Sequence, residues 1–207
     1  MPDCLYIEMH PQNPNPRDVD RVVAVLKRGG IIIYPTDTVY GIGCDIKNTK
    51  AVERIIKLKG LKPKEAHFSF ICKDLSNITD FAKVNNPTFK LMKKNLPGPF
   101  TFILPGLHRV PNYFLSKRKT VGIRIPNHKI PIELVERLGN PILTTSLKDS
   151  DEIIEYTTDP EQIYENYHNL VDVVIDGGAC GNVPSTIVDC TEDEPLIIRE
   201  GLGELRL

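Results

Sequence analysis

Segments with helical periodicity and segments with strand periodicity alternate along the whole of this chain. Apolar residues recur at spacings of three, four and seven between residues 16 and 27, which predicts an amphipathic helix, and a short buried strand follows at Ile31–Tyr34. Further helices are expected at residues 49–59, 87–95, 130–138 and after 159, and further strands at 67–71, 100–104, 120–125, 142–145, 171–175, 186–189 and 196–199. This alternation favours the α/β class.

The length of 207 residues allows one large domain or two small ones. Neither a Gly- or Ser-rich linker nor an internal repeat divides the sequence, so we expect a single domain. No apolar run approaches the ~20 residues that span a bilayer, and the first residues do not resemble a secretory signal. We therefore expect a cytoplasmic protein.

The cysteines and histidines do not form a recognisable motif. The sequence contains five cysteines, but it has no CxxC pair and no Cys/His spacing typical of zinc, so we expect reduced thiols and no metal site. It also lacks HExxH, GxSxG and a Walker-type phosphate loop. The metalloproteases, serine hydrolases and P-loop enzymes are therefore unsupported.

Charge is distributed unevenly although the formal net charge is only -1. Residues 81–132 contain no Asp or Glu but carry a set of basic residues: Lys83, Lys90, Lys93, Lys94, Arg109, Lys117, Arg118, Lys119, Arg124 and Lys129. From residue 149 onward the balance is acidic. The basic part indicates an anionic partner, either a nucleotide phosphate or a nucleic acid, unless it is simply a solvated surface.

The strand Ile31–Tyr34 continues directly into Pro35-Thr36-Asp37-Thr38-Val39-Tyr40-Gly41-Ile42-Gly43. Three residues of this segment, Thr36, Thr38 and Tyr40, offer hydroxyl groups, and its two glycines would allow a ligand to approach the backbone. Loops of this kind after a strand commonly bind ligands in α/β proteins, although a plain turn has the same composition.

Residues 29–43, Gly-Gly-Ile-Ile-Ile-Tyr-Pro-Thr-Asp-Thr-Val-Tyr-Gly-Ile-Gly, resemble the opening signature of the YrdC-like family, which includes the threonylcarbamoyl-AMP synthases. Further blocks of the family follow in order, at residues 59–60, 97–101, 120–126, 141–146, 184–189 and 199–201. The resemblance covers about residues 16–203. Residues 68–76, Phe-Ser-Phe-Ile-Cys-Lys-Asp-Leu-Ser, make the chain most similar to the YciO-like branch.

The resemblance implies one α/β domain over residues 1–207, with a twisted, mainly mixed sheet flanked by helices and a basic concave cleft. It also implies a nucleotidyltransferase that condenses L-threonine, bicarbonate and ATP into threonylcarbamoyl-AMP and pyrophosphate. The family uses that product to modify an adenosine of tRNA. The expected partners are thus ATP as a substrate, with Mg²⁺ inferred only from ATP use, and tRNA or another RNA bound through the basic cleft.

Family motifs carried over residue by residue divide the expected site into two parts. The residues expected around threonine are Thr38, Arg124, Thr144 and Ser185. The residues expected around ATP are Lys59, Thr120, Ser146 and Arg199, and of these Lys59 and Ser146 are the expected catalytic residues. An arginine suits a carboxylate, and two basic side chains can neutralise phosphates.

Two positions depart from the synthase motifs, because Leu61 stands in place of an Arg and Lys148 in place of an Asn. A leucine has neither the five donors nor the fixed charge of a guanidinium. We therefore expect weak synthesis of threonylcarbamoyl-AMP, or none. The alternatives are an RNA-binding protein of the same family without efficient synthase activity and a small-molecule binding protein without turnover.

Overall fold

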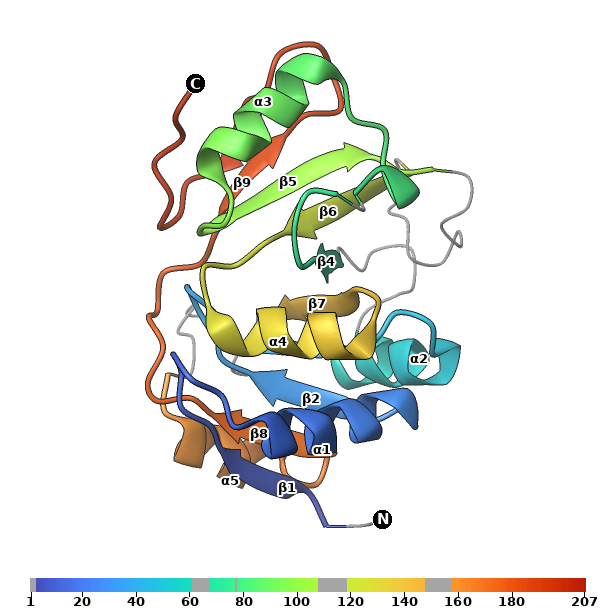
Figure 1. Ribbon diagram of the computed structural model, residues 1–207, viewed down its shortest axis with the longest axis vertical. Helices are drawn as coiled ribbons and strands as arrows, with labels where there is room; N and C mark the ends of the chain where they lie inside the picture. The colour runs from blue at the N-terminus through green and yellow to red at the C-terminus, as the bar shows by residue number, and fades with distance from the viewer. Residues whose placement is uncertain (1–2, 61–67, 77, 108–118, 148–157) are drawn as a thin grey trace.

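The structure, a computed structural model, describes residues 3–60, 68–76, 78–107, 119–147 and 158–207. Helices and strands alternate within these ranges, as the sequence predicts (Figure 1). The helices are α1 (Pro16–Lys27), α2 (Thr49–Leu58), α3 (Asn86–Asn95), α4 (Lys129–Leu138) and α5 (Pro160–Tyr167), with a 3-10 turn at Ile78–Asp80. The strands are β1 (Leu5–Glu8), β2 (Ile31–Tyr34), β3 (Gly41–Asp45), β4 (Ser69–Ile71), β5 (Phe100–Pro105), β6 (Thr120–Arg124), β7 (Ile142–Ser146), β8 (Val173–Asp176), β9 (Thr186–Asp189) and β10 (Leu196–Arg199).

The helix ends follow from side chains that satisfy the free backbone groups of the first and last turns. Asn15 caps α1, where its side chain accepts from the Arg17 amide and Pro16 occupies the first turn. Asn48 caps α2 by accepting from the Ala51 amide at 3.1 Å. Gly139 ends α4 with a φ of 78°, a conformation that favours glycine.

The described strands form one ten-stranded sheet in the order β1-β8-β2-β3-β7-β4-β6-β5-β9-β10. Four neighbouring pairs are parallel, namely β1/β8, β8/β2, β4/β6 and β5/β9. The other five pairs are antiparallel. The expectation of a single α/β domain with a mixed sheet is therefore confirmed.

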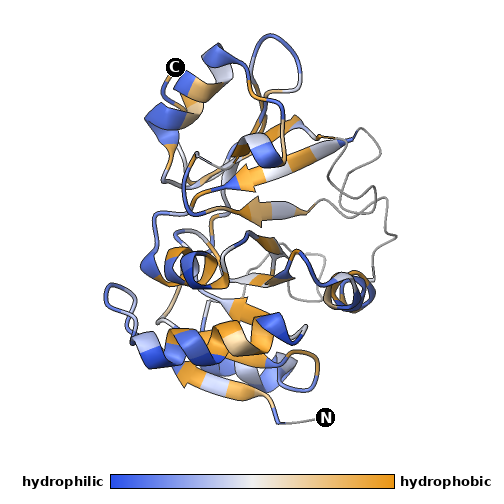
Figure 2. Ribbon diagram, turned by 45° about the vertical axis from the view of Figure 1, so that its right-hand side comes forward, coloured by the Kyte–Doolittle hydropathy of each residue, from blue (hydrophilic) through white to orange (hydrophobic). Residues whose placement is uncertain are grey.

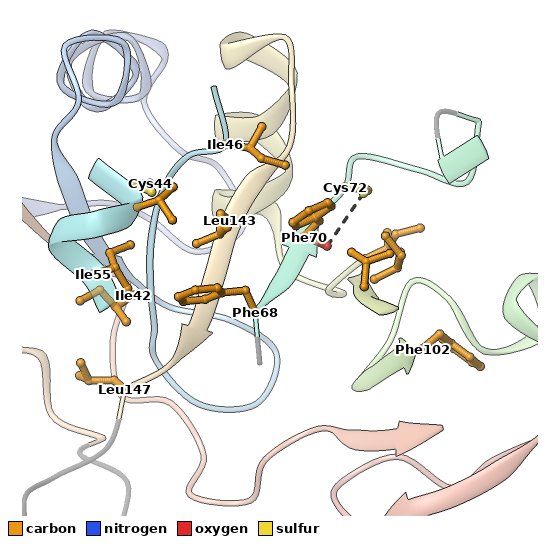
Figure 3. Close-up of a cluster of buried hydrophobic side chains, with 14 of the residues drawn as sticks. Ile42, Cys44, Ile46, Ile55, Phe68, Phe70, Cys72, Phe102, Leu143 and Leu147 are labelled. Carbon is orange, nitrogen blue, oxygen red and sulfur yellow. Dashed lines mark hydrogen bonds between the residues drawn. The ribbon is translucent and has the colours of Figure 1, made fainter. Parts of the chain in front are cut away.

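Alternating side chains of β2 point into two separate hydrophobic cores. Ile31 and Ile33 join the core beneath α2, α3 and α5, whereas Ile32 and Tyr34 join the core beneath α1 and α4. Both faces of this part of the sheet are therefore covered, which explains why all four residues of the strand are buried. The strands are accordingly mostly hydrophobic, while the helices mix hydrophobic and hydrophilic residues (Figure 2). Figure 3 shows side chains from several strands in the first core.

The segment from Gly41 to Asp45 forms the central strand β3, whereas the sequence predicts a loop that extends to Gly43. This strand pairs with β2 on one side and β7 on the other. A Cβ atom on Gly43 would lie 3.2 Å from Cε1 of Tyr34 and 2.7 Å from Cγ2 of Ile142. The glycine thus makes room for the Tyr34 ring, and its low strand propensity hides the strand from sequence reasoning. The strand β1 also escaped prediction.

None of the helices in the described ranges has both the length and the apolar character needed to cross a bilayer.

Candidate functional site

A polar patch lies on the face of the sheet that α1 and α4 cover elsewhere. Ile71 of β4 packs beneath these helices, and its partner in the β4/β6 register is Arg124. Among the described residues, none from β5, β6 or β9 belongs to that hydrophobic core. At this point the face of the sheet changes from apolar to polar, and Arg124 stands at the border.

Gly122 leaves space in this patch because it has no side chain. Its β4 partner is Ser69, and a Cβ atom at position 122 would lie 2.6 Å from Oγ of Ser69 and 3.3 Å from Cγ2 of Thr101. Any larger residue would therefore displace Ser69 or Thr101. The glycine of the Thr120–Arg124 block has this local packing role.

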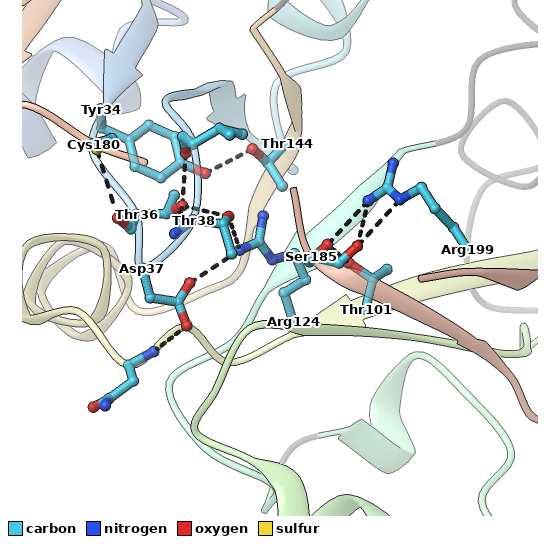
Figure 4. Close-up of polar contacts among 12 residues, drawn as sticks. Tyr34, Thr36, Asp37, Thr38, Thr101, Arg124, Thr144, Cys180, Ser185 and Arg199 are labelled. Carbon is cyan, nitrogen blue, oxygen red and sulfur yellow. Dashed lines mark hydrogen bonds and ion pairs between the residues drawn. The ribbon is translucent and has the colours of Figure 1, made fainter. Parts of the chain in front are cut away.

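Arg124 lies in the centre of the patch and is only 7% exposed. Its Nη2 atom donates to Oδ1 of Asp37 at 3.1 Å and to Oγ1 of Thr38 at 3.1 Å (Figure 4). Its Nε atom is buried and has no hydrogen-bond partner among the described residues. Because an unpaired buried donor is costly, this N–H is suited to an acceptor atom supplied by a ligand. The predicted proximity of Thr38 and Arg124 is thus confirmed.

Asp37 ties the loop after β2 to the turn before α4. While Oδ1 receives the Arg124 guanidinium, Oδ2 accepts from the backbone amide of Asn127 at 2.9 Å. Its side chain is 9% exposed. Sequence reasoning did not include Asp37 among the site residues, although a lone carboxylate in a hydroxyl-rich loop directly after a strand is the signal that could have indicated it.

The hydroxyl groups of Thr36 and Thr38 form a hydrogen-bonded series in which the donor of each bond is defined. Thr36 donates its single proton to the carbonyl of Val39 at 2.7 Å, so the 3.1 Å contact between Thr36 and Thr38 must use the proton of Thr38. Thr38 also accepts from Arg124. Its hydroxyl is therefore left with one lone pair, and it can only accept from a ligand.

The third hydroxyl of the loop, that of Tyr40, does not face this patch. It donates to the carbonyl of Gly178 at 2.8 Å, in the turn that follows β8. The side chain thus joins two loops, which is a structural role.

Ser185 lies next to the patch, just before β9, and is also buried. Its Oγ atom is 2.9 Å from Oγ1 of Thr101 on β5, the strand beside Arg124 (Figure 4). Arg199 donates to the Ser185 carbonyl from Nε at 3.1 Å and from Nη2 at 2.7 Å. The Arg199 guanidinium therefore fixes the backbone at Ser185. Thr101 is a second residue that sequence reasoning missed.

Thr144 uses its hydroxyl within the protein. It accepts from the hydroxyl of Tyr34 at 2.7 Å and donates to the Ile42 carbonyl at 3.2 Å. Burial raises the pKa of Tyr34 to about 12, so its phenol stays protonated at neutral pH. Thr144 thus has no proton left for a ligand.

Of the remaining residues expected around ATP, Thr120 and Ser146 lie on strands that border the patch, whereas Lys59 follows α2, which packs on the opposite face of the sheet. Lys59 follows the last turn of α2, and Thr120 begins β6. Ser146 ends β7 opposite Gly41, and the next amide, that of Leu147, donates to the Tyr40 carbonyl at 3.0 Å. This places Ser146 beside the end of the loop. Leu61 and Lys148 lie outside the described residues.

Two titratable groups near Asp37 are uncharged at neutral pH. Burial lowers the pKa of His128, although the carboxylate of Asp37 opposes this effect. Burial raises the pKa of the Cys180 thiol to about 11. Within the ranges that the structure describes, no three His, Cys, Asp or Glu side chains gather in a way that could hold a metal ion. Among the described residues, the charged groups of the patch are thus the Asp37–Arg124 pair in its centre and Arg199 beside it at Ser185.

The basic stretch 81–132 does not occupy one common environment. Arg124 is buried against Asp37, while Lys94 donates to the Leu207 carbonyl at 2.6 Å. Lys90 and Lys94 also border a cavity of about 220 Å³ together with Asp193. Arg109, Lys117 and Arg118 lie outside the described residues, so the basic cleft stays a prediction.

Comparison with known proteins reveals close relatives. YciO of Escherichia coli strain K12 is 41% identical to this chain and matches over 97% of both chains. The threonylcarbamoyl-AMP synthase of Bacillus subtilis is 31% identical over 90% of this chain. The matched part is 54% of that synthase, so this chain spans about half of its length.

Solved structures give the same result for the fold. The crystal structure of E. coli YciO superposes with a TM-score of 0.90 over 97% of both chains, at 40% identity. Sua5 of Pyrococcus abyssi, in complex with L-threonine, superposes with a TM-score of 0.86 at 28% identity, over 95% of this chain and 57% of Sua5. The family described as "Telomere recombination", Sua5/YciO/YrdC, matches residues 24–201. This chain therefore belongs to the Sua5/YciO/YrdC family.

Proposed function

We propose that this chain forms threonylcarbamoyl-AMP from L-threonine, bicarbonate and ATP, and that it does so more slowly than the synthases to which it is similar. The observation that carries the proposal is the buried Nε of Arg124, which has no partner among the described residues. In this proposal the carboxylate of threonine accepts from that atom, because a guanidinium binds a carboxylate with strong, charge-assisted hydrogen bonds. The choice of threonine as the ligand is supported by the P. abyssi relative, whose structure contains L-threonine.

The proposed reaction has two bond-forming steps. The deprotonated amine of threonine attacks the carbon of bicarbonate, and loss of water gives a carbamate. A carbamate oxygen then attacks the α-phosphorus of ATP, and the bond to the bridging oxygen breaks to release pyrophosphate. This chemistry needs positioning and charge stabilisation more than a protein nucleophile.

In this proposal one group of residues binds the amino acid and another binds the nucleotide. Arg124 and Thr38 hold the amino acid, while Arg199 keeps Ser185 in place next to them. Lys59, Thr120 and Ser146 are proposed to lie along the nucleotide, and Mg²⁺ enters with the ATP phosphates as part of the substrate. The replacement of Arg by Leu61 and of Asn by Lys148 reduces the rate.

Product analysis tests this proposal. The protein is incubated with ATP, bicarbonate and L-threonine, beside the B. subtilis synthase, and the nucleotides are separated and identified by mass. We expect slow formation of threonylcarbamoyl-AMP and an equal amount of pyrophosphate, both dependent on threonine. If no threonylcarbamoyl-AMP forms under conditions in which the B. subtilis synthase makes it, the proposal is wrong.

RNA binding without synthesis is the second candidate, and the acid-free stretch at residues 81–132 favours it. Because multiple phosphate contacts release counterions, tRNA binding through this stretch would weaken steeply with salt. Tight and salt-sensitive tRNA binding in a protein that makes no adenylate would favour this candidate.

A further inference from the structure

The ion pair at the centre of the site is electrically neutral as a unit. Asp37 and Arg124 are in contact at 3.1 Å, and their side chains are 9% and 8% exposed. His128 and Cys180, which lie close to Asp37, are uncharged at pH 7 for the reasons given above. A ligand group bound directly against this pair therefore adds its own charge at a largely desolvated position, where an uncompensated charge is expensive.

This neutrality distinguishes three kinds of ligand. A simple carboxylate would satisfy Arg124 but leave one excess negative charge beside Asp37. An amine without a carboxylate would leave one excess positive charge beside Arg124. A zwitterion adds no net charge, so an amino acid with both groups matches the pair.

Asp37 also has room to accept a hydrogen bond. A carboxylate offers about four lone-pair positions, and the hydrogen bonds from Arg124 and Asn127 use two of them. The adjacent Thr38 hydroxyl can only accept, as its contacts with Thr36 and Arg124 require. Acceptor groups for a ligand ammonium thus lie next to the donor for a ligand carboxylate.

We propose that Asp37 is a specificity-determining residue that makes the site select amino acids over carboxylates without an amino group. This inference rests on the proposed function, since it concerns the amino-acid end of the same site. It assigns to Asp37 the recognition of the substrate ammonium, in addition to its contacts with Arg124 and Asn127.

Calorimetric titration of the full chain with three ligands tests the proposal. The ligands are L-threonine, its α-hydroxy analogue 2,3-dihydroxybutyrate, and threoninol, which lacks the carboxylate. We expect each analogue to bind at least about tenfold more weakly than threonine, the effect of losing one hydrogen bond to a charged group.

The variant Asp37→Asn provides the second measurement. It should lower affinity for threonine and bring the threonine-to-hydroxy-acid ratio to one or below, because Arg124 then balances a ligand carboxylate by itself. The matched control is Asp20→Asn, which removes an exposed carboxylate paired with Arg137 and should leave the ratio unchanged.

The outcomes separate this inference from the proposed function. If Asp37→Asn weakens threonine and the hydroxy acid by the same factor, Asp37 has only a structural role and the inference is wrong. Should that variant fail to fold, equal binding of threonine and the hydroxy acid by the wild-type protein would still overturn it. If the wild-type protein binds no threonine at all, the proposed function fails, and the inference fails with it.

Discussion

Nη2 of Arg124 donates to Oγ1 of Thr38 across 86 positions of sequence, at a distance of 3.1 Å. The contact joins the end of β6 to the loop after β2, two segments that are not neighbours in the sheet. The two residues belong to separate motif blocks, at residues 29–43 and 120–126. The sequence alone relates these blocks only by their order in the family. The candidate site is therefore built where these segments meet.

Replacement of Gly43 by alanine should destabilise the protein, because the new Cβ would lie 2.7 Å from both Cγ2 of Ile142 and the Leu143 carbonyl. We expect the free energy of unfolding to fall by about 1–3 kcal/mol, the usual cost of overpacking a core. Urea denaturation measures this loss. The control is Gly41→Ala, whose nearest contact is a less severe 3.2 Å to Oγ1 of Thr144, so its cost should be smaller. An equal loss at both positions would contradict this explanation.

Stability should decrease at alkaline pH because buried thiols resist ionisation in the folded state. Burial raises the pKa of Cys72 to about 12, whereas in the unfolded chain this thiol ionises near its ordinary value. Stabilisation is thus complete below about pH 8.5 and is lost as the pH rises toward 12, by up to about 1.4 kcal/mol per pH unit for this group. Urea denaturation at pH 8 and pH 10 measures the slope.

The variant Cys72→Ala should make that slope shallower. Its control is Ile71→Val, a buried neighbour that does not titrate, which should reduce stability by a similar amount at both pH values. An unchanged slope in Cys72→Ala would show that ionisation of this thiol does not contribute.

Restoring the synthase residues at two positions should increase adenylate formation. A charged or polar group directed at the charge that develops in the transition state lowers the activation free energy by ~2.7–4 kcal/mol, which is about 10²–10³ in rate. The effects of two such groups are rarely additive. The double variant Leu61→Arg with Lys148→Asn should therefore produce more threonylcarbamoyl-AMP per hour than the wild-type protein. Lys50→Asn, an exposed change of the same kind on α2, should have no effect. Wild-type synthesis as fast as that of the B. subtilis enzyme would show that other residues replace the missing groups.

The sequence predicted the helices and most strands well, because their boundaries are encoded by local chemistry. Asn48 caps α2 and Gly139 ends α4, as capping preferences require. The strand β3 was missed because Gly41 and Gly43 have low strand propensity, and only their close packing against Tyr34 and the strand β7 explains them. Such packing depends on residues distant in sequence.

The candidate site was predicted only in part. Thr38 and Arg124 meet as expected, and Ser185 lies nearby with Arg199 bound to it. Asp37 and Thr101 were missed because their roles depend on contacts across the sheet, which a single sequence does not reveal. The nucleotide-binding and catalytic roles of Lys59, Thr120 and Ser146 stay predictions.

Titration of L-threonine into the wild-type protein and into Arg124→Ala tests the central claim most directly. The control variant is Arg54→Ala, which removes a guanidinium from the exposed ion pair with Asp172, and thermal unfolding establishes that each variant is folded. We expect Arg124→Ala to weaken threonine binding by about 1.5–3 kcal/mol, the range for a hydrogen bond to a charged group. We expect Arg54→Ala to bind like the wild-type protein. Unchanged threonine affinity in a folded Arg124→Ala variant would contradict the account.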